Sequence, residues 1–266
     1  MCPPNESRGD LPCRSGHVCG IRRPRRRIVR IVFTFAGAWA LIGVVGAASP
    51  PHVDAAAVVR LSNETTLSHW AYPEYPARAR AAPGIGARTI TRLRYFTENR
   101  QLELYLALEM RTDESGVTWV KVRLPMRPNG RIGWVPRAAL GRLHRVQTHL
   151  VINRRTLRAA LFRRGRRIWR APIGVGRPTL PTPGGRFYIR ERLRSLNPFY
   201  GPVAFGTSAY SAHLTDWPGG GVVGIHGTSL PALVPGRPSH GCVRLRNRDI
   251  LRLARLMPKG TPVRIL

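Results

Sequence analysis

The chain has 266 residues, of which 43% are hydrophobic, so it can bury a real core and is not an intrinsically disordered protein. Its length fits one large domain or two small ones. The 44 basic and 13 acidic residues give a formal net charge of +31, which favours an anionic partner such as nucleic acid, anionic lipid or an acidic polymer. The charge is dispersed along the chain, which argues against a dedicated nucleic-acid surface.

A hydrophobic segment follows a basic N-terminal region. Residues 1–30 become increasingly rich in arginine, and residues 31–48 carry no charge. Eighteen residues make about 27 Å of helix, just enough to cross a bilayer. Because arginines that precede such a segment stay in the cytoplasm, residues 31–48 are predicted to be a transmembrane anchor or signal segment, with the following chain exported.

Two regions of different character come next. Residues 49–87 are rich in proline, alanine and arginine, which predicts a linker. Residues 88–146 contain short runs of alternating apolar residues, separated by turn-forming sequences such as Pro128-Asn129-Gly130, and we predict a small antiparallel β unit. The tryptophan pair Trp119-Val120 and Gly133-Trp134-Val135-Pro136 resembles bacterial SH3-like domains.

The pattern of residues 147–266 also predicts mainly β structure, in a domain that we expect to fold on its own. One helix is expected from Asn247 to Met257, with Asn247 as its cap. The long stretch from Glu191 to Gly221 contains several proline and glycine turns, and we predict a loop that forms one wall of a substrate cleft. Tyr210 and Trp217 in this stretch are candidate substrate contacts or packing residues.

Cys242 is the candidate nucleophile. It is the only cysteine after the hydrophobic segment, so an exported chain would offer it no intramolecular disulfide partner. The sequence Ser239-His240-Gly241-Cys242 places small residues and a histidine beside the thiol, and His226 lies upstream. Thiol chemistry requires a base within hydrogen-bond reach and N–H donors for the oxyanion. The alternative is that Cys242 is a small core residue.

The order of the candidate groups restricts the class of enzyme. No histidine follows Cys242, so its base must be His226, His240, His213 or a histidine further upstream. Papain-like and NlpC/P60-type cysteine peptidases place the cysteine before the histidine. That order is absent here.

The run His226-Gly227-Thr228, followed by Ser239-His240-Gly241-Cys242-Val243-Arg244-Leu245, resembles the L,D-transpeptidases with a YkuD-type catalytic domain. The resemblance covers residues 147–266 and implies a β-sandwich catalytic domain. It makes His226 the base, the Gly227 carbonyl its orienting group, and the N–H groups of His240, Gly241 and Cys242 the oxyanion donors. Many members carry asparagine two residues after the cysteine, where this chain has Arg244. Ser239, Arg244 and Asn247 are the further expected substrate-binding residues.

The resemblance also implies a function. A Cys242 thiolate beside a His226 imidazolium would take an acyl group from a peptidoglycan stem peptide as a thioester, and a second stem would resolve it into a 3→3 cross-link. The alternatives are an L,D-carboxypeptidase, with water as acceptor, and an inactive wall-binding scaffold. We expect an enzyme of the cell envelope with no metal and no cofactor. Stem peptides are its expected partners, with an anionic wall polymer as a further partner and no nucleic acid.

Overall fold

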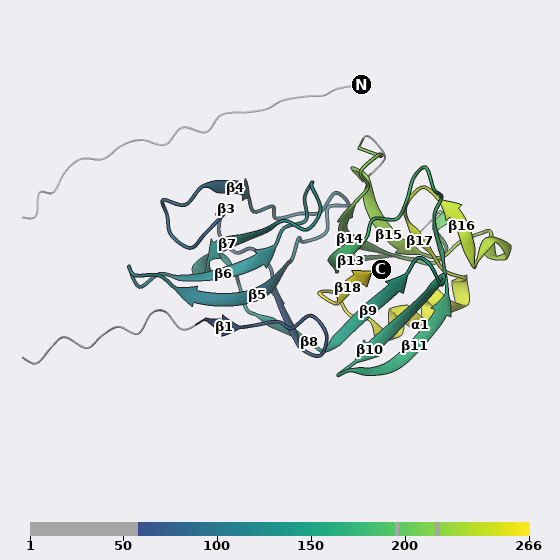
Figure 1. Cartoon of the computed structure of the whole chain (residues 1–266), viewed down its shortest axis with the longest axis horizontal. Helices are drawn as coiled ribbons and strands as arrows, with labels where there is room; N and C mark the ends of the chain where they lie inside the picture. Colours follow the sequence, from purple (N-terminus) through teal and green to yellow (C-terminus); the bar gives the residue numbers. More distant parts are fainter. Residues whose placement is uncertain (1–57, 195–196, 216–218) are drawn as a thin grey trace, which may run out of the picture. The chain divides into compact units, whose positions relative to one another are not determined.

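The structure is a computed structural model that describes residues 58–194, 197–215 and 219–266. These residues form mostly β structure with one α-helix, as the sequence predicts (Figure 1). Residues 51–266 make one compact unit. The predicted membrane segment, residues 31–48, lies outside the described residues. Within the described part of the chain, no helix is long and apolar enough to cross a membrane.

The first sheet, which we call the N-terminal sheet, has the strand order β4-β3-β7-β6-β5-β2-β8, with β1 paired to β5. Its strands are β1 (Val59–Arg60), β2 (Ser68–Ala71), β3 (Arg78–Arg80), β4 (Thr89–Arg92), β5 (Tyr105–Thr112), β6 (Thr118–Arg123), β7 (Ile132–Pro136) and β8 (His144–Val146), with a 3₁₀ turn at Arg137–Ala139. The sheet closes around a small apolar core that includes Tyr105, Val120 and Val135.

The predicted linker is wrong for residues 58–87. This segment contributes β1, β2 and β3 to the sheet, and Ala71 and Ala79 are fully buried. The prolines of this segment led to the linker prediction. Pro76 and Pro83 lie between strands, where the missing proline N–H removes no hydrogen bond from the sheet. The β unit predicted from residue 88 onward therefore also includes β1, β2 and β3 in the structure.

The second sheet, the C-terminal sheet, has the order β11-β10-β9-β18-β13-β14-β15-β17-β12-β16. Its strands are β9 (Thr148–Asn153), β10 (Arg158–Arg163), β11 (Arg166–Pro172), β12 (Gly174–Gly176), β13 (Gly185–Arg194), β14 (Val203–Tyr210), β15 (Val222–His226), β16 (Gly236–Ser239), β17 (Val243–Arg244) and β18 (Pro262–Ile265). Two further 3₁₀ turns lie at Pro198–Tyr200 and Pro231–Leu233. The sheet curves around the larger core, which includes Phe187, Phe205 and Ile225.

The stretch from Glu191 to Gly221 is not one long loop. Strand β13 continues to Arg194, and β14 crosses the middle of the stretch with seven of its eight residues buried. Small residues in Val203–Tyr210 mask the alternation that normally marks a strand, because they are buried on both faces. Only the ends of the stretch are connections.

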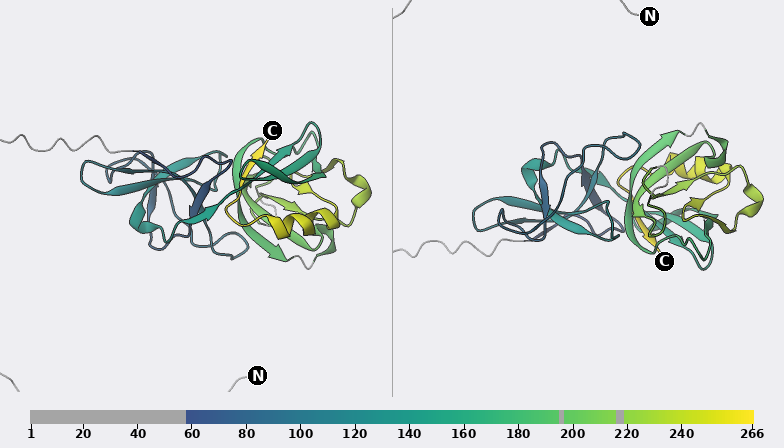
Figure 2. Two further views of the ribbon diagram at one scale, coloured as in Figure 1. Left: turned by 90° about the horizontal axis from the view of Figure 1, so that it is seen from below. Right: turned by 90° about the horizontal axis from the view of Figure 1, so that it is seen from above.

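The helix α1 (Asn247–Leu256) covers part of the larger core (Figure 2). Its apolar face buries Ile250, Leu253 and Ala254 at the spacing of one helical face. The helix ends at Leu256, two residues before Pro258, close to the predicted end at Met257. The strand β18 then returns into the sheet between β9 and β13.

Candidate active site

The chain turns sharply between β16 and β17, and this turn carries Cys242. Gly241 has φ +122°, a conformation that side chains rarely adopt, so glycine is required there. Ser239 holds the turn from inside, since its hydroxyl donates to the Cys242 carbonyl at 2.6 Å and accepts from the Gly241 N–H at 3.1 Å. Ser239 was predicted as a substrate contact. It lines the pocket, but its hydroxyl is used to shape the nucleophile turn.

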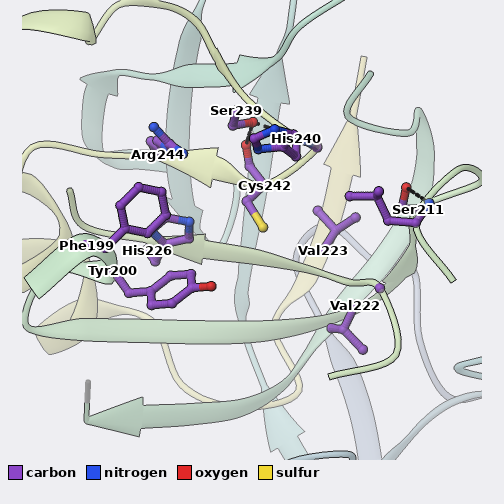
Figure 3. A pocket seen from close by; sticks show the side chains of 13 residues that line it. Phe199, Tyr200, Ser211, Val222, Val223, His226, Ser239, His240, Cys242 and Arg244 are labelled. Carbon is purple, nitrogen blue, oxygen red and sulfur yellow. Dashed lines mark hydrogen bonds between the residues drawn. The ribbon is translucent and has the colours of Figure 1, made fainter. Parts of the chain in front are cut away.

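The Cys242 side chain points into a pocket that is built mainly from the ends of β15, β16 and β17 (Figure 3). The Gly224 N–H donates to the Cys242 sulfur at 3.4 Å. A Cβ atom placed on Gly224 would lie 3.7 Å from both Cys242 Sγ and His226 Cδ2, so the sulfur and the imidazole border the same small space. The pocket is lined by Phe199, Tyr200, Ser211, Leu214, Gly221, Val222, Val223, His226, Ser239, His240, Gly241, Cys242 and Arg244.

His226 ends β15, where parallel pairing sets it opposite Arg244 of β17. Its ring is only 2% exposed, and Nδ1 lies 2.6 Å from the Gly227 carbonyl. A carbonyl can only accept a hydrogen bond, so this contact requires the proton on Nδ1 and leaves the Nε2 lone pair available as a base. The edge of Tyr200 packs against the ring, with centroids 4.9 Å apart.

Burial sets the charge state of the two groups. It lowers the pKa of His226 to about 4, with a further contribution from the positive charge of Arg244 and opposition from the Gly227 carbonyl. Burial also raises the pKa of the Cys242 thiol, against the Gly224 hydrogen bond and the charge of Arg244. Burial thus disfavours the charged form of each group.

Arg244 brings an uncompensated positive charge to the pocket. It is 5% exposed, its guanidinium lies 4.7 Å from the centre of the Phe199 ring, and its Nε is buried without a hydrogen-bond partner in the described structure. A buried guanidinium donor without a partner is costly, and a carboxylate is the group that it binds best. Arg244 is therefore suited to hold an anionic group of a ligand.

Asn247 has a different place from the predicted one. Its Oδ1 accepts from the Thr228 N–H at 2.9 Å, and it neither lines the pocket nor caps α1 through its side chain. A Cβ atom on Gly201 or on Gly227 would lie 2.4 Å from this oxygen, so the three groups are packed closely. Asn247 thus fixes the segment that holds the Gly227 carbonyl against His226. In the described structure this bond, and not the pocket lining, is where the Asn247 side chain lies.

Tyr210 also lies outside the pocket. Its hydroxyl donates to Glu98 at 2.6 Å and accepts from Arg94 at 2.9 Å, both residues of the N-terminal part. The prediction of Tyr210 as a substrate contact is therefore replaced by a role between the two sheets. Trp217 lies outside the described residues. His240, Gly241 and Cys242 come together at the pocket as predicted from their adjacency.

Sequence reasoning missed the aromatic pair Phe199 and Tyr200, which lines the pocket beside Arg244 and His226. The pair lies on a 3₁₀ turn whose first N–H groups are capped by Asn197, as shown by the 2.9 Å bond from the Phe199 N–H to its Oδ1. The sequence does contain a signal for this pair. Two aromatic residues in a connection, between Pro198 and Gly201, are expected to face a ligand rather than a core.

Comparisons with known proteins find relatives of the C-terminal region. Residues 147–265 match the family model of the L,D-transpeptidase catalytic domain, YkuD. The curated "Putative L,D-transpeptidase YkuD" of Bacillus licheniformis is 38% identical over 114 residues, which cover 43% of this chain and 61% of that protein. Its namesake in Bacillus subtilis is 38% identical over 94 residues, which cover 35% of this chain and 51% of that protein. The matched region thus spans between half and two thirds of these relatives.

Solved structures give matches over similar lengths. The catalytic domain of an E. faecium L,D-transpeptidase is 25% identical with a TM-score of 0.36, covering 45% of this chain and 97% of that one. The LD transpeptidase LdtMt1, solved in complex with imipenem, is 17% identical with a TM-score of 0.37, covering 56% of this chain and 90% of that one.

Proposed function

We propose that the L,D-transpeptidase catalytic domain in residues 147–265 transfers acyl groups between peptidoglycan stem peptides and forms 3→3 cross-links through a Cys242 thioester. The observation that carries the proposal is the shared pocket of Cys242 and His226, in which a Gly227-bound imidazole leaves its free nitrogen as a base beside the thiol. The pocket wall also offers the cation of Arg244.

The first half-reaction needs a proton transfer at the moment of attack. His226 Nε2 takes the thiol proton while the Cys242 sulfur bonds to the carbonyl carbon between an L-centre and the terminal D-residue of a stem. The carbonyl oxygen becomes an oxyanion, for which the N–H groups of the His240–Cys242 turn are the donors. The C–N bond then breaks, the D-amino acid leaves with the proton from His226, and a thioester remains.

The second half-reaction returns the enzyme to its starting state. An amine from the side chain of a second stem gives a proton to His226 and attacks the thioester carbonyl carbon. The C–S bond breaks, the sulfur recovers its proton, and the new amide is the cross-link. Water in place of the amine would give L,D-carboxypeptidase activity.

Arg244 supplies the binding energy that orients the donor stem in this proposal. Its buried and unpartnered Nε fits a carboxylate of the substrate, since the stem carries carboxylates near the scissile amide. The excess of arginine over acidic residues throughout the chain also favours retention near an anionic wall polymer.

The substrate places the enzyme outside the cytoplasm, with residues 31–48 as the proposed anchor or signal segment. A reporter that is active only outside the cytoplasm, fused after Leu266, should be active. A signal from a reporter that works only in the cytoplasm would contradict both the localisation and the argument from the unpaired thiol.

The chemistry is tested by the mass of the protein after incubation with a carbapenem, whose strained amide can acylate a thiol. The region from residue 49 onward should gain one carbapenem mass. His226→Ala should slow the acylation by ~10²–10⁴-fold, the usual value of general-base assistance, and Cys242→Ala should abolish it. Titration of the free thiol in the same sample checks that Cys242 is reduced.

The outcomes separate the alternatives. No adduct on folded, reduced protein would favour the inactive wall-binding scaffold, and an adduct on Cys242→Ala would mean that the nucleophile is another residue. Incubation with disaccharide-tetrapeptides then distinguishes the enzymes. Cross-linked dimers indicate transpeptidation, whereas tripeptides alone indicate carboxypeptidase activity.

A further inference from the structure

One wall of the active-site pocket comes from the connection between β14 and β15. Ser211, Leu214 and Gly221 of this connection line the pocket together with Val222, the first residue of β15, and we call these four residues the pocket wall. The β14–β15 pairing is irregular between Gly206 and Tyr210, and it resumes where Tyr210 pairs with Val222. A main-chain hydrogen bond from the Ser211 N–H to the Gly221 carbonyl at 2.8 Å also joins the two sides of the connection.

Within the connection, the Ser211 hydroxyl accepts from the N–H groups of His213 at 3.2 Å and Leu214 at 3.1 Å. Further support comes from the N-terminal part of the chain. Arg127, in the connection between β6 and β7, donates through Nε to the Ser211 carbonyl at 3.1 Å. Its Nη2 donates to the carbonyls of Leu214 at 3.0 Å and Gly220 at 2.8 Å. One guanidinium thus donates hydrogen bonds to three carbonyls, which lie on both sides of the connection. Such bonds from an ionised donor are stronger than those between neutral groups.

Asn129, two residues after Arg127, extends the same contact. Its Nδ2 donates to the Tyr210 carbonyl at 2.7 Å, and its Oδ1 accepts from the Tyr210 N–H at 2.9 Å, the geometry of a strand partner. The Arg127 guanidinium also lies 4.8 Å from the centre of the Tyr210 ring. The end of β14 is therefore paired with a side chain of the other sheet at the residue before the pocket wall begins.

The fit around Arg127 is close. Gly221 has φ +72°, and a Cβ atom there would lie 1.8 Å from the Leu214 carbonyl oxygen and 2.6 Å from Arg127 Nη2. Only glycine is compatible with this arrangement. The residue that lines the pocket and the guanidinium that holds the wall are thus in direct contact.

We propose that Arg127 and Asn129 are positioning residues of the active site, through which the N-terminal sheet fixes the pocket wall and so the binding of an extended stem peptide. This inference rests on the proposed function for the identity of the substrate. Neither residue lines the pocket, so their effect on the reaction passes through the main chain of Ser211, Leu214 and Gly220.

The test compares Arg127→Ala, Arg127→Lys and Asn129→Ala with the control Arg131→Ala, which removes an exposed arginine from the same connection. Three readouts are measured in the exported region: kcat and KM with disaccharide-tetrapeptide, the alkylation rate of Cys242 by iodoacetamide, and hydrogen exchange of the peptides that carry Ser211 and Val222. Because iodoacetamide is small, its reaction with the Cys242 thiol requires access to the sulfur but no contact with the pocket wall.

Arg127→Ala should lower kcat/KM by roughly 10–100-fold, mainly through KM, because displacements of about 1 Å are known to cost that much. Exchange at Ser211 and Val222 should accelerate, and alkylation should change by less than about twofold, as expected for sites that do not interact. Asn129→Ala should act in the same direction, Arg127→Lys should restore part of the loss, and Arg131→Ala should match the wild type.

Wild-type values of kcat/KM and exchange in Arg127→Ala would overturn the inference. So would a loss of turnover in which hydrogen exchange accelerates throughout the protein, which would indicate general unfolding. Failure of the wild type to react with carbapenem would instead reject the proposed function, and the exchange data would still decide whether Arg127 holds the wall.

Discussion

Burial disfavours the charged forms of both reacting side chains, and this predicts the pH dependence of the reaction. Burial lowers the pKa of His226 to about 4 from the ordinary value of 6.5. We therefore expect the base to be available between these two pH values, where an exposed histidine would be protonated. We expect the acid limb of the carbapenem acylation rate to lie near pH 4–5, and a limb near pH 6.5 would contradict the buried neutral imidazole.

The same shift predicts how stability changes with pH. A histidine with a lower pKa in the folded state contributes stability above its unfolded pKa, and the contribution is lost as pH falls from 6.5 toward about 4. The melting temperature of wild type should thus fall more than that of His226→Gln over this window. Identical curves for the two proteins would indicate that His226 is solvated.

Arg244 offers a prediction about binding rather than proton transfer. Arg244→Gln should raise KM for stem peptides by roughly 10–100-fold, the value of a hydrogen bond to a charged group, with a smaller effect on kcat. Since the charge of Arg244 also lowers the pKa of His226, the acid limb should move to higher pH. The matched control is Arg248→Gln, because the Arg248 side chain is 75% exposed. An unchanged KM in Arg244→Gln would rule out the carboxylate contact.

At the residue scale, contacts between residues that are adjacent in the sequence could be predicted, and contacts between distant residues could not. Cys242, Gly241 and His240 share one turn, so their meeting at the pocket follows from the chain itself. Tyr210 bonds Glu98, 112 residues away, and no local pattern carries that information. The charge states of the site residues could not be predicted from the sequence either, because they depend on burial by groups from several strands.

At the scale of elements, the start of α1 and the end of β15 act together. Asn247→Ala removes the acceptor for the Thr228 N–H and should destabilise the protein by about 1–3 kcal/mol, the cost of a buried donor left unpaired. It should also slow acylation, because the Gly227 carbonyl loses its fixed position against His226.

Asn247→Asp is the matched variant, since it keeps the acceptor oxygen at the same place. Chemical denaturation and carbapenem acylation are measured together. Recovery of both in Asn247→Asp would support the positioning role, whereas slow acylation with normal stability in both variants would return Asn247 to the list of substrate contacts.

Elements with clear alternation were predicted well, and those with small or proline-rich sequences were not. Strand β6 (Thr118–Arg123), for example, lies in the region where alternating apolar residues predict an antiparallel β unit. Strand β14 was taken for a loop, because Gly206, Ser208 and Ala209 blur its pattern. Its burial comes from neighbours on both sides, β13 and β15, which a single sequence does not display.

At the scale of the whole molecule, the predicted boundary near residue 147 hides a shared interior. Tyr188 of the C-terminal sheet is buried in one apolar cluster with Trp70, Leu104 and Leu106 of the N-terminal part. A fragment that begins at residue 147 would expose this surface. The domain that sequence analysis expects to fold on its own should therefore be less stable than the longer chain, as thermal unfolding of the fragment would reveal.

A buried ion pair lies beside that cluster. Arg190 of β13 is fully buried and donates through Nε to Glu103 at 2.9 Å, with a second contact between Nη2 and the same carboxylate. Glu98 lies 3.0 Å from Arg190. Burial opposes ionisation of Glu98, but the charge of Arg190 and the hydrogen bond from Tyr210 outweigh it and lower the pKa of Glu98 to about 2. The C-terminal sheet thus supplies a cation whose counter-charges all belong to the N-terminal part.

Glu103→Gln should therefore destabilise the whole chain by roughly 3–5 kcal/mol, because removing one partner leaves a buried charge poorly compensated. The control is Glu109→Gln, whose ion pair with Lys121 is 26–28% exposed and should be worth at most about 1 kcal/mol. Glu103→Leu combined with Arg190→Met should be less destabilising than Glu103→Gln alone, since an apolar pair of similar size often replaces a buried ion pair without penalty. Urea unfolding is followed in a background that carries Trp169→Phe and Trp217→Phe, with tryptophan fluorescence reporting on the N-terminal part and Cys242 reactivity on the C-terminal part. Coincident transitions in wild type, with a shared shift in Glu103→Gln, are expected; separate transitions, or a shift confined to one half, would mean that the two sheets fold independently.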